Sequence, residues 1–400
     1  MKTSFLKAGH TPTLIAAFLY FDLAFMVWVI LGPLAPLISK DLGLNAAEKG
    51  LMVATPTLAG ALLRIVNGLL CDRIGPKLSG TISQLIVIAG LLFAWYVGVH
   101  SFAGTLALGV ILGFAGASFA IALPLASRWY PPEHQGKAMG IAGMGNSGTV
   151  LASLFAPVLA KAFGWNEVLG LACIPLAVVL VLYVVMAKDA PDQPAPKPLA
   201  AYFEVLKTAD AWWFMLFYSV TFGGFVGLAA SLSIYFTETF GLTAIHAGYA
   251  TAGCVFAGSL VRPMGGALAD RIGGLRTLTV VYLVACMTLV GVSMNPPGFA
   301  AALSLFVVSM LALGCGNGAV FQLVPQRFRK EIGIMTGLVG MAGGVGGFYL
   351  ASSLGFAKQV TGSFGPGFLI FAGLCAVAFG AVTFVKGRWR SSWATHGVRI

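Results

Sequence analysis

The sequence predicts an all-α polytopic membrane protein in which twelve transmembrane helices form two pseudo-symmetric six-helix bundles. Three observations predict this fold: a lipid-like composition, twelve long apolar stretches, and a second half that repeats the first. Of the 400 residues, 58% are hydrophobic and 9% are charged, whereas soluble domains carry about 25% charged residues. The composition therefore excludes both an ordinary soluble enzyme and a disordered chain.

Twelve stretches have the roughly 20 apolar residues that a helix needs to cross the hydrocarbon core of a membrane. The first, from about Thr13 to Ile38, is too long and too late to be a cleaved signal peptide, so we expect it to remain as an anchor. The stretches centre near Phe25, Leu58, Ile88, Phe114, Thr149, Val178, Gly223, Cys254, Leu283, Leu311, Val345 and Ala376.

The basic residues predict the orientation of the spans. Of the 24 Lys and Arg residues, four fall in loops on one side of the membrane: Lys40, Lys49, Lys161 and Lys358. Apart from two arginines inside spans, the others fall on the opposite side. Basic loops remain cytoplasmic, so we expect a cytoplasmic-membrane protein with both termini in the cytoplasm. The net charge of +11 is explained by this topology and requires no nucleic acid.

The sequence contains no pattern that indicates a metal, a cofactor or a disulfide. The six cysteines form no CxxC pair and lie mostly in spans, and the five histidines fall in tails or loops: His10, His100, His134, His246 and His396. No GxxxxGK[ST] phosphate-binding loop occurs. We therefore expect neither an enzyme nor an ATP-driven pump, and we expect a monomer in contact with membrane lipid.

The chain divides into residues 1–187, a polar linker at residues 188–210, and residues 211–400. The segment GLLCDRIG, with Asp72 and Arg73, recurs as GALADRIG, with Asp270 and Arg271, 198 residues later. A repeat at a nearly constant offset indicates an internal duplication. A parallel duplication of six helices is typical of transporters. We expect each aspartate just beyond a helix end.

Three ionisable residues fall well inside spans: Asp22, Arg64 and Arg262. Charged residues within spans are rare because each costs at least about 2.5–3.5 kcal/mol at a helix centre. The two arginines are also 198 residues apart, so they occupy equivalent places, one per bundle, and we expect them to face each other across a central cavity. One arginine alone could snorkel to the interface or donate to main-chain carbonyls. Two at a duplicated position favour a shared anionic substrate, which a planar guanidinium binds through paired hydrogen bonds.

The loop motif resembles that of the major facilitator superfamily, in which it latches the two bundles in the outward-facing state. Its plainer interpretation is a short turn that carries topology charges. The whole chain further resembles the nitrate/nitrite porters of that superfamily, most specifically in the segments GFAGASFAIALP, GIAGMGNSG, YSVTFGGFVG and GLVGMAGGVGGF. This resemblance implies rocker-switch transport of nitrate and/or nitrite. It also implies substrate contacts from Arg64, Arg262, Tyr218, Phe222, Phe119 and Asn146.

Glycine runs mark the fifth and eleventh spans. Gly140, Gly143 and Ser147 lie on one stripe of the fifth span, and Gly337, Gly340 and Gly344 repeat that stripe on the eleventh. We expect these small residues to let helices approach and slide. We expect Gly343 either to bring main chain near the substrate or to soften the helix.

Two alternatives stay open at this point. The same fold could carry another small anion, such as a monocarboxylate. Asp22 could carry a coupled proton or hydrogen-bond a neighbouring helix, and we favour the hydrogen bond.

Overall fold

The computed structural model describes residues 5, 8–191, 198–328 and 331–392, and the regular secondary structure in this part of the chain is helical. Twelve of its helical segments are long and apolar enough to cross a membrane, which confirms the predicted number of spans. The termini, which the basic residues predict to be cytoplasmic, lie outside the described residues.

Six spans precede the linker. They are formed by α1 (Thr11–Trp28) with α2 (Leu31–Leu42), α3 (Ala46–Ile74), α4 (Pro76–Val97), α5 (Phe102–Gly116) with α6 (Phe119–Ser127), α7 (Pro132–Gly143) with the 3-10 turn η2 (Met144–Ser147) and α8 (Gly148–Phe163), and α9 (Trp165–Met186). The short helix α10 (Leu199–Leu206) lies in the linker. The later spans are α11 (Ala209–Phe240), α12 (Ala244–Ile272), α13 (Gly274–Ser293), α14 (Phe299–Arg327), α15 (Ile332–Thr361) and α16 (Gly365–Ser392).

The first span is longer than predicted and is broken near its middle. It runs from Thr11 to Leu42. Pro33 has no N–H to donate to the carbonyl of Val29, four residues earlier. Gly32 instead donates to that carbonyl at 2.9 Å, an i to i+3 bond that tightens the chain where α1 meets α2.

The duplication is visible in the helix ends. Helices α3 and α12 each contain 29 residues, and α12 starts and ends 198 residues after α3. Both end at a glycine with positive φ, 85° at Gly75 and 100° at Gly273, a conformation that costs glycine little. The N-cap residues of the two helices, Asn45 and Thr243, are also 198 residues apart. The side chain of each accepts a hydrogen bond from a main-chain N–H in the first turn.

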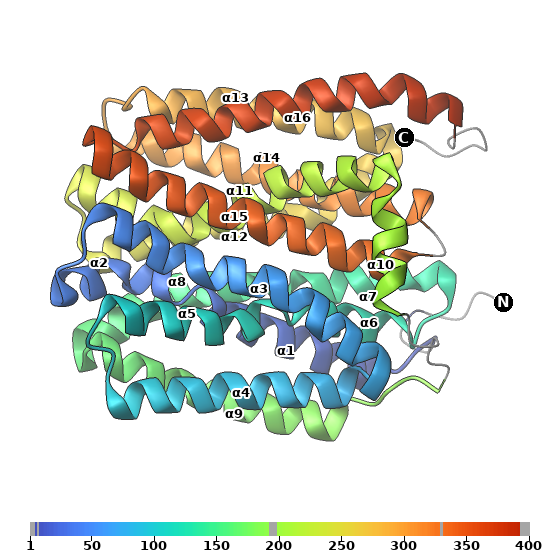
Figure 1. Cartoon of the computed structure of the whole chain (residues 1–400), viewed down its shortest axis with the longest axis horizontal. Helices are drawn as coiled ribbons and strands as arrows, with labels where there is room; N and C mark the ends of the chain where they lie inside the picture. The colour runs from blue at the N-terminus through green and yellow to red at the C-terminus, as the bar shows by residue number, and fades with distance from the viewer. Residues whose placement is uncertain (1–4, 6–7, 192–197, 329–330, 393–400) are drawn as a thin grey trace.

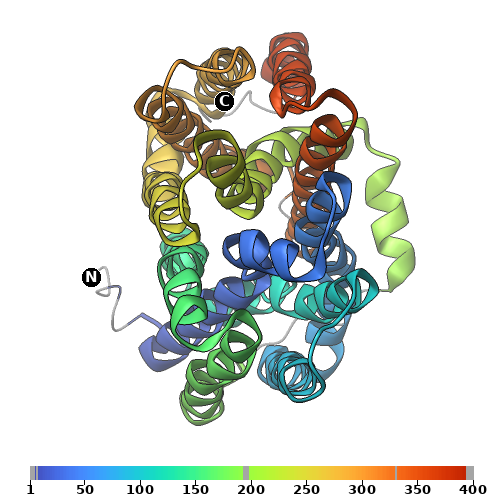
Figure 2. The same ribbon diagram turned by 90° about the vertical axis from the view of Figure 1, so that its left-hand side faces the viewer.

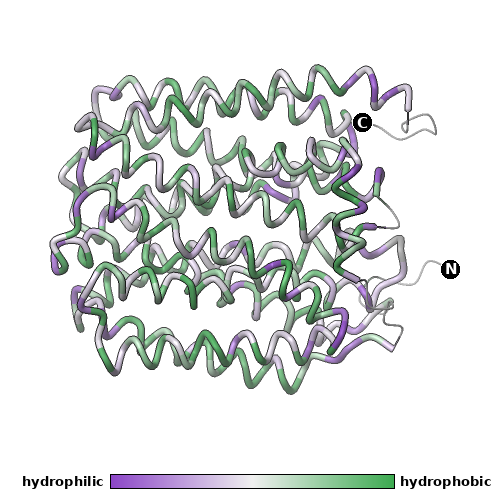
Figure 3. The backbone as a smooth tube through the Cα atoms, in the orientation of Figure 1, coloured by the Kyte–Doolittle hydropathy of each residue, from purple (hydrophilic) through white to green (hydrophobic). Residues whose placement is uncertain are grey.

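The helices before the linker and those after it gather in separate halves of the molecule (Figure 2). We call the end where α1 begins and α10 lies the linker end, and the opposite end, with the turns at Gly43 and Gly241, the far end (Figure 1). Hydrophobic residues run along the helices, and hydrophilic residues gather at both ends (Figure 3). Large apolar side chains such as Phe93 and Phe384, 65% and 72% exposed, thus cover a surface suited to lipid.

One seam between the halves runs along α3 and α15, which pack side by side in opposite directions. Near the far end, a Cβ atom on Gly50 would lie 2.8 Å from the Cα of Gly355. Further along, a Cβ on Gly344 would lie 2.7 Å from that of Ala61. Only glycine permits main chains to approach so closely, so this seam depends on its glycines.

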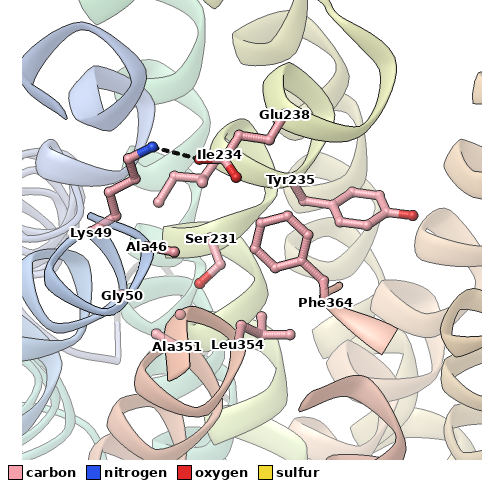
Figure 4. Close-up of a pocket in the computed structure, with 11 residues that line it drawn as sticks. Ala46, Lys49, Gly50, Ser231, Ile234, Tyr235, Glu238, Ala351, Leu354 and Phe364 are labelled. Carbon is pink, nitrogen blue, oxygen red and sulfur yellow. Dashed lines mark hydrogen bonds and ion pairs between the residues drawn. The ribbon is translucent and has the colours of Figure 1, made fainter. Parts of the chain in front are cut away.

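Polar contacts between the halves close the far end of the seam. Lys49 of α3 forms an ion pair with Glu238 of α11, with 2.7 Å between Nζ and Oε1. The ion pair lies beside Ser231 and Ala46 (Figure 4). The main-chain N–H of Ala46 donates to the side chain of Gln359 at 3.1 Å.

The predicted linker extends too far at its second boundary. Helix α11 begins at Ala209, so Asp210 belongs to the seventh span. Its carboxylate accepts from Nε of Arg327 at 2.6 Å and from Nε1 of Trp389 at 2.8 Å. The carboxylate is therefore held by two other spans of its own half, and it is 4% exposed. A local count of polar residues could not reveal these partners.

We predict that Gly265→Ala lowers the thermal stability of the purified protein. A Cβ there would lie 2.6 Å from the Cα of Cys315, so α12 and α14 must separate, and overpacking of this kind typically costs about 1–3 kcal/mol. Gly380→Ala, in α16, is the matched control because a Cβ there meets no atom within 4 Å. The measurement is the melting temperature in detergent, and equal losses in the two variants would contradict the prediction.

Candidate functional site

The two intramembrane arginines converge on one aromatic ring. Arg64 projects from α3 and Arg262 from α12, and their guanidinium carbons lie 5.2 Å and 5.9 Å from the ring centroid of Phe119. Arg64 is 1% exposed, and Arg262 is half-buried. The structure thus brings the equivalent residues of the two halves to a common place between the bundles.

Hydrogen bonds hold each guanidinium group but leave part of it unpaired. Nε of Arg64 donates to the carbonyl of Gly116 at 3.2 Å, and Nη1 donates to the carbonyl of Gly340 in the other half. Nη2 of Arg262 donates to the hydroxyl of Tyr218 at 3.2 Å. Among the described residues, neither Nη2 of Arg64 nor Nη1 of Arg262 has a hydrogen-bond partner, and both atoms are buried. A buried charged donor without an acceptor is costly, so two of them favour a ligand with acceptor oxygens.

The predicted aromatic pair of α11 lies against these cations. The rings of Tyr218 and Phe222 are stacked, 5.0 Å apart and 5° from parallel, as their i, i+4 spacing suggests. The guanidinium carbon of Arg64 lies 5.1 Å from the Phe222 centroid. A Cβ on Gly343 would lie 2.7 Å from a ring carbon of Tyr218. Glycine at this position therefore leaves room for the stack.

Two further aromatic residues were missed by the sequence analysis. Trp28 of α1 stacks on Phe222 at 14° and lies 5.5 Å from the guanidinium carbon of Arg64. Phe321 of α14 meets Tyr218 edge-on at 5.0 Å and lies 5.7 Å from Phe119. A repeated pattern could have revealed Phe321, because GASF ending at Phe119 recurs as GAVF 202 residues later. No comparable signal marks Trp28.

Asn146 lies in η2, the 3-10 turn in the middle of the fifth span. It is 1% exposed, and both polar atoms of its side chain are buried with no hydrogen-bond partner in the part of the chain that the structure describes. The turn packs between α1 and α12, the helix that carries Arg262. An unsatisfied amide beside this helix is suited to a polar ligand.

Close approach occurs at two of the three glycines predicted for the eleventh span and at neither of those predicted for the fifth. A Cβ on Gly340 would lie 3.3 Å from Nη1 of Arg64 and one on Gly344 2.7 Å from the Cβ of Ala61, whereas one on Gly337 would meet only Tyr202, at 3.8 Å. A Cβ on Gly140 or Gly143 would meet no described atom within 4 Å. In the fifth span the close approach occurs instead at Gly145 and Gly148, which pack against α1, the helix that carries Asp22. Gly140 and Gly143 precede the 3-10 turn, and spacing along a helix does not determine which neighbouring helix a face meets.

Asp22 lies on α1 and is 7% exposed. Its carboxylate accepts a hydrogen bond of 2.7 Å from the hydroxyl of Ser147, the last residue of η2. This contact is the hydrogen bond to a neighbouring helix that we favoured from the sequence.

The two loop motifs differ in their surroundings. Asp72 and Asp270 lie inside the last turns of α3 and α12, which corrects the expectation that they follow the helix ends, because the helices end only at the following glycines. Asp72 pairs with Arg128 of its own half at 2.7 Å. Asp270 is exposed, as are Arg73 and Arg271.

The histidines do not all lie in loops as expected. His134 is in α7 and His246 is in the first turn of α12, whereas His396 lies outside the described residues. Within the described part of the chain, no group of three or more His, Cys, Asp or Glu side chains is arranged to hold a metal ion.

Comparisons with known proteins agree with this architecture. Residues 16–351 match the family model of the Major Facilitator Superfamily. The nitrite extrusion protein of Bacillus subtilis is 34% identical over 380 residues, 94% of each chain. The probable nitrate/nitrite transporter NarK2 of Mycobacterium tuberculosis is 34% identical over 85% of this chain and 87% of its own. The probable nitrate/nitrite antiporter NarK1 of Thermus thermophilus is 31% identical over 90% and 88%.

A solved structure shares the fold. The bacterial homologue of the human lysosomal transporter Spinster, crystallised in an inward-facing and occupied conformation, superposes with a TM-score of 0.71. The match covers 95% of this chain and 97% of the other at 18% identity.

Proposed function

This chain belongs to the nitrate/nitrite porter family of the major facilitator superfamily, and we propose that it carries nitrate and/or nitrite across the cytoplasmic membrane. The anion binds between Arg64 and Arg262. One observation carries the proposal: two guanidinium groups from equivalent places in the two halves meet at one ring, and each keeps a buried nitrogen unpaired.

The chemistry of the site suits a small planar anion. Each guanidinium is a planar set of donors. Together the two groups carry two positive charges, one more than a singly charged anion neutralises. The unpaired nitrogens donate to the anion's oxygens, and charge-assisted bonds of this kind are stronger than neutral ones. The parallel rings of Tyr218 and Phe222 and the ring of Phe119 give the site flat walls that favour a flat ligand over a tetrahedral one.

The positions at which the halves touch support an alternating-access cycle. The Lys49–Glu238 ion pair and the Gly50–Gly355 contact join the bundles at the far end. In a rocker-switch cycle these contacts break as the bundles tilt, and the anion site then opens towards the far end. The basic loops put the linker end, with both termini, in the cytoplasm, and the protein works as a monomer.

Anion movement in this proposal needs no proton. Arginine does not release a proton at physiological pH, and the carboxylate of Asp22 is engaged by Ser147. The arrival of a second anion is enough to reset the two arginines, as in an exchanger.

We expect nitrate uptake by the protein in liposomes, with internal nitrite accelerating it and a clamped pH gradient leaving it unchanged. Excess nitrite should compete with labelled nitrate, whereas a monocarboxylate such as acetate, with its non-planar methyl group, should compete weakly. Empty liposomes are the control. Stronger competition by the monocarboxylate than by nitrite would favour the alternative substrate class.

Arg64→Lys and Arg262→Lys should each slow nitrate transport by roughly 10- to 100-fold, because lysine keeps the charge but loses the paired donors. Arg388→Lys, at an exposed position of α16, is the matched control and should transport normally. Uptake is measured at equal amounts of folded, reconstituted protein. Transport by either site variant at the control rate would rule out the two-arginine clamp.

Phe222→Ala and Phe119→Ala should raise the nitrate concentration for half-maximal uptake several-fold, because each removes a ring that lies against a guanidinium group. Phe384→Ala, whose ring is 72% exposed on the outer surface, serves as the control. An unchanged half-saturation concentration in both site variants would assign these rings to packing alone.

A further inference from the structure

The fifth span contains a single 3-10 turn, Met144–Ser147, between α7 and α8. A 3-10 stretch within a helix has poorer hydrogen-bond geometry and often marks a functional position. This turn carries Asn146, whose buried amide has no hydrogen-bond partner among the described residues. An unpaired amide is useful for binding only if its orientation is held, so the contacts that hold the turn are important.

Two kinds of contact fasten the turn to α1. The hydroxyl of Ser147 donates to the carboxylate of Asp22 at 2.7 Å and also lies 2.9 Å from the carbonyl of Met144, the first residue of the turn. Gly145 and Gly148 lie directly against α1, where a Cβ on Gly145 would come within 2.9 Å of the main-chain nitrogen of Asp22. The hydroxyl has a single hydrogen, and its donation to Asp22 ties the last residue of the turn to α1.

We infer that Asp22 is a positioning residue, which fixes the Met144–Ser147 turn against α1 and thereby orients the amide of Asn146 towards the anion held by the arginines. This inference rests on the proposed function. A carboxylate is suited to the task because it only accepts hydrogen bonds, and a bond to an ionised acceptor is short and strong. Since its charge is directed at Ser147, it supports the anion site through the turn.

The test measures nitrate affinity by the thermal stabilisation of the purified protein. Asp22→Ala and Ser147→Ala should each weaken nitrate binding by roughly tenfold, as expected for an amide that is no longer held in place. Asp22→Asn should bind almost as wild type does, because its amide oxygen still accepts from Ser147. Ser153→Ala removes a buried hydroxyl of α8 that donates to the carbonyl of Thr149 in its own helix, so it is the matched control and should bind normally.

A double-mutant cycle with Asn146→Ala separates positioning from a general structural role. If Asp22 acts through Asn146, Asp22→Ala causes no further loss of affinity in the Asn146→Ala background. Equal losses with and without Asn146 would overturn the inference. It would also fail if Asp22→Asn abolished a dependence of uptake on the proton gradient, since Asp22 would then carry the proton. If Asp22→Ala does not fold, the same double-mutant cycle is measured with Ser147→Ala in its place.

The two proposals fail in different ways. If the wild-type protein is not stabilised by nitrate or nitrite, the proposed function is wrong, and the cycle is repeated with formate as the probe. If wild type binds nitrate and the cycle is additive, only the role of Asp22 is wrong.

Discussion

Two like charges buried between the halves of a membrane protein form the constraint on which the rest of this structure depends. Each guanidinium group costs several kcal/mol to bury, and the surroundings offset that cost only in part. Main-chain carbonyls of Gly116 and Gly340 accept from Arg64, the hydroxyl of Tyr218 accepts from Arg262, and aromatic faces lie against both. In the described part of the chain, one buried nitrogen on each arginine still has no hydrogen-bond partner. In the proposed mechanism an anion supplies the missing acceptors, so part of its binding free energy is the relief of this unfavourable burial.

The halves repeat one backbone plan but use it with different side chains. Helices α3 and α12 match in length, spacing and capping, yet Arg64 is held by main chain and Arg262 by a tyrosine hydroxyl. The fifth span provides Asn146, whereas the eleventh has Gly343, which leaves room for the aromatic stack. Duplication therefore accounts for the pair of charges, and divergence accounts for a site with different walls on its two sides.

The seam between α3 and α15 connects the far end to this site. These helices run in opposite directions, with the Gly50–Gly355 contact near the far end and the hydrogen bond from Arg64 to Gly340 at the site. Arg64 follows Lys49 by 15 residues, which is roughly 22 Å of helix rise. Helix α3 is continuous between these residues, with Pro56 inside it, so in the proposed cycle opening the Lys49–Glu238 end would also alter the seam beside Arg64. The linker-end motifs lie beyond the site on α3 and α12, and Asp72 pairs there within its own half.

The sequence by itself determined the properties that depend on local composition and on spacing along one helix. Hydropathy predicted twelve spans, the offset of 198 predicted the equivalence of α3 and α12, and the rarity of intramembrane charge marked Arg64, Arg262 and Asp22. The i, i+4 spacing of Tyr218 and Phe222 placed both rings on one face. Only the tertiary structure decided which faces meet. It brought Trp28 and Phe321 to the site, moved the close contacts of the fifth span from Gly143 to Gly145 and Gly148, and gave Asp22 its partner in Ser147. The physical reason is that spacing defines a residue's direction about its own helix axis, whereas the rotation of that helix, and the phase shift at a 3-10 turn, are set by packing against residues distant in sequence.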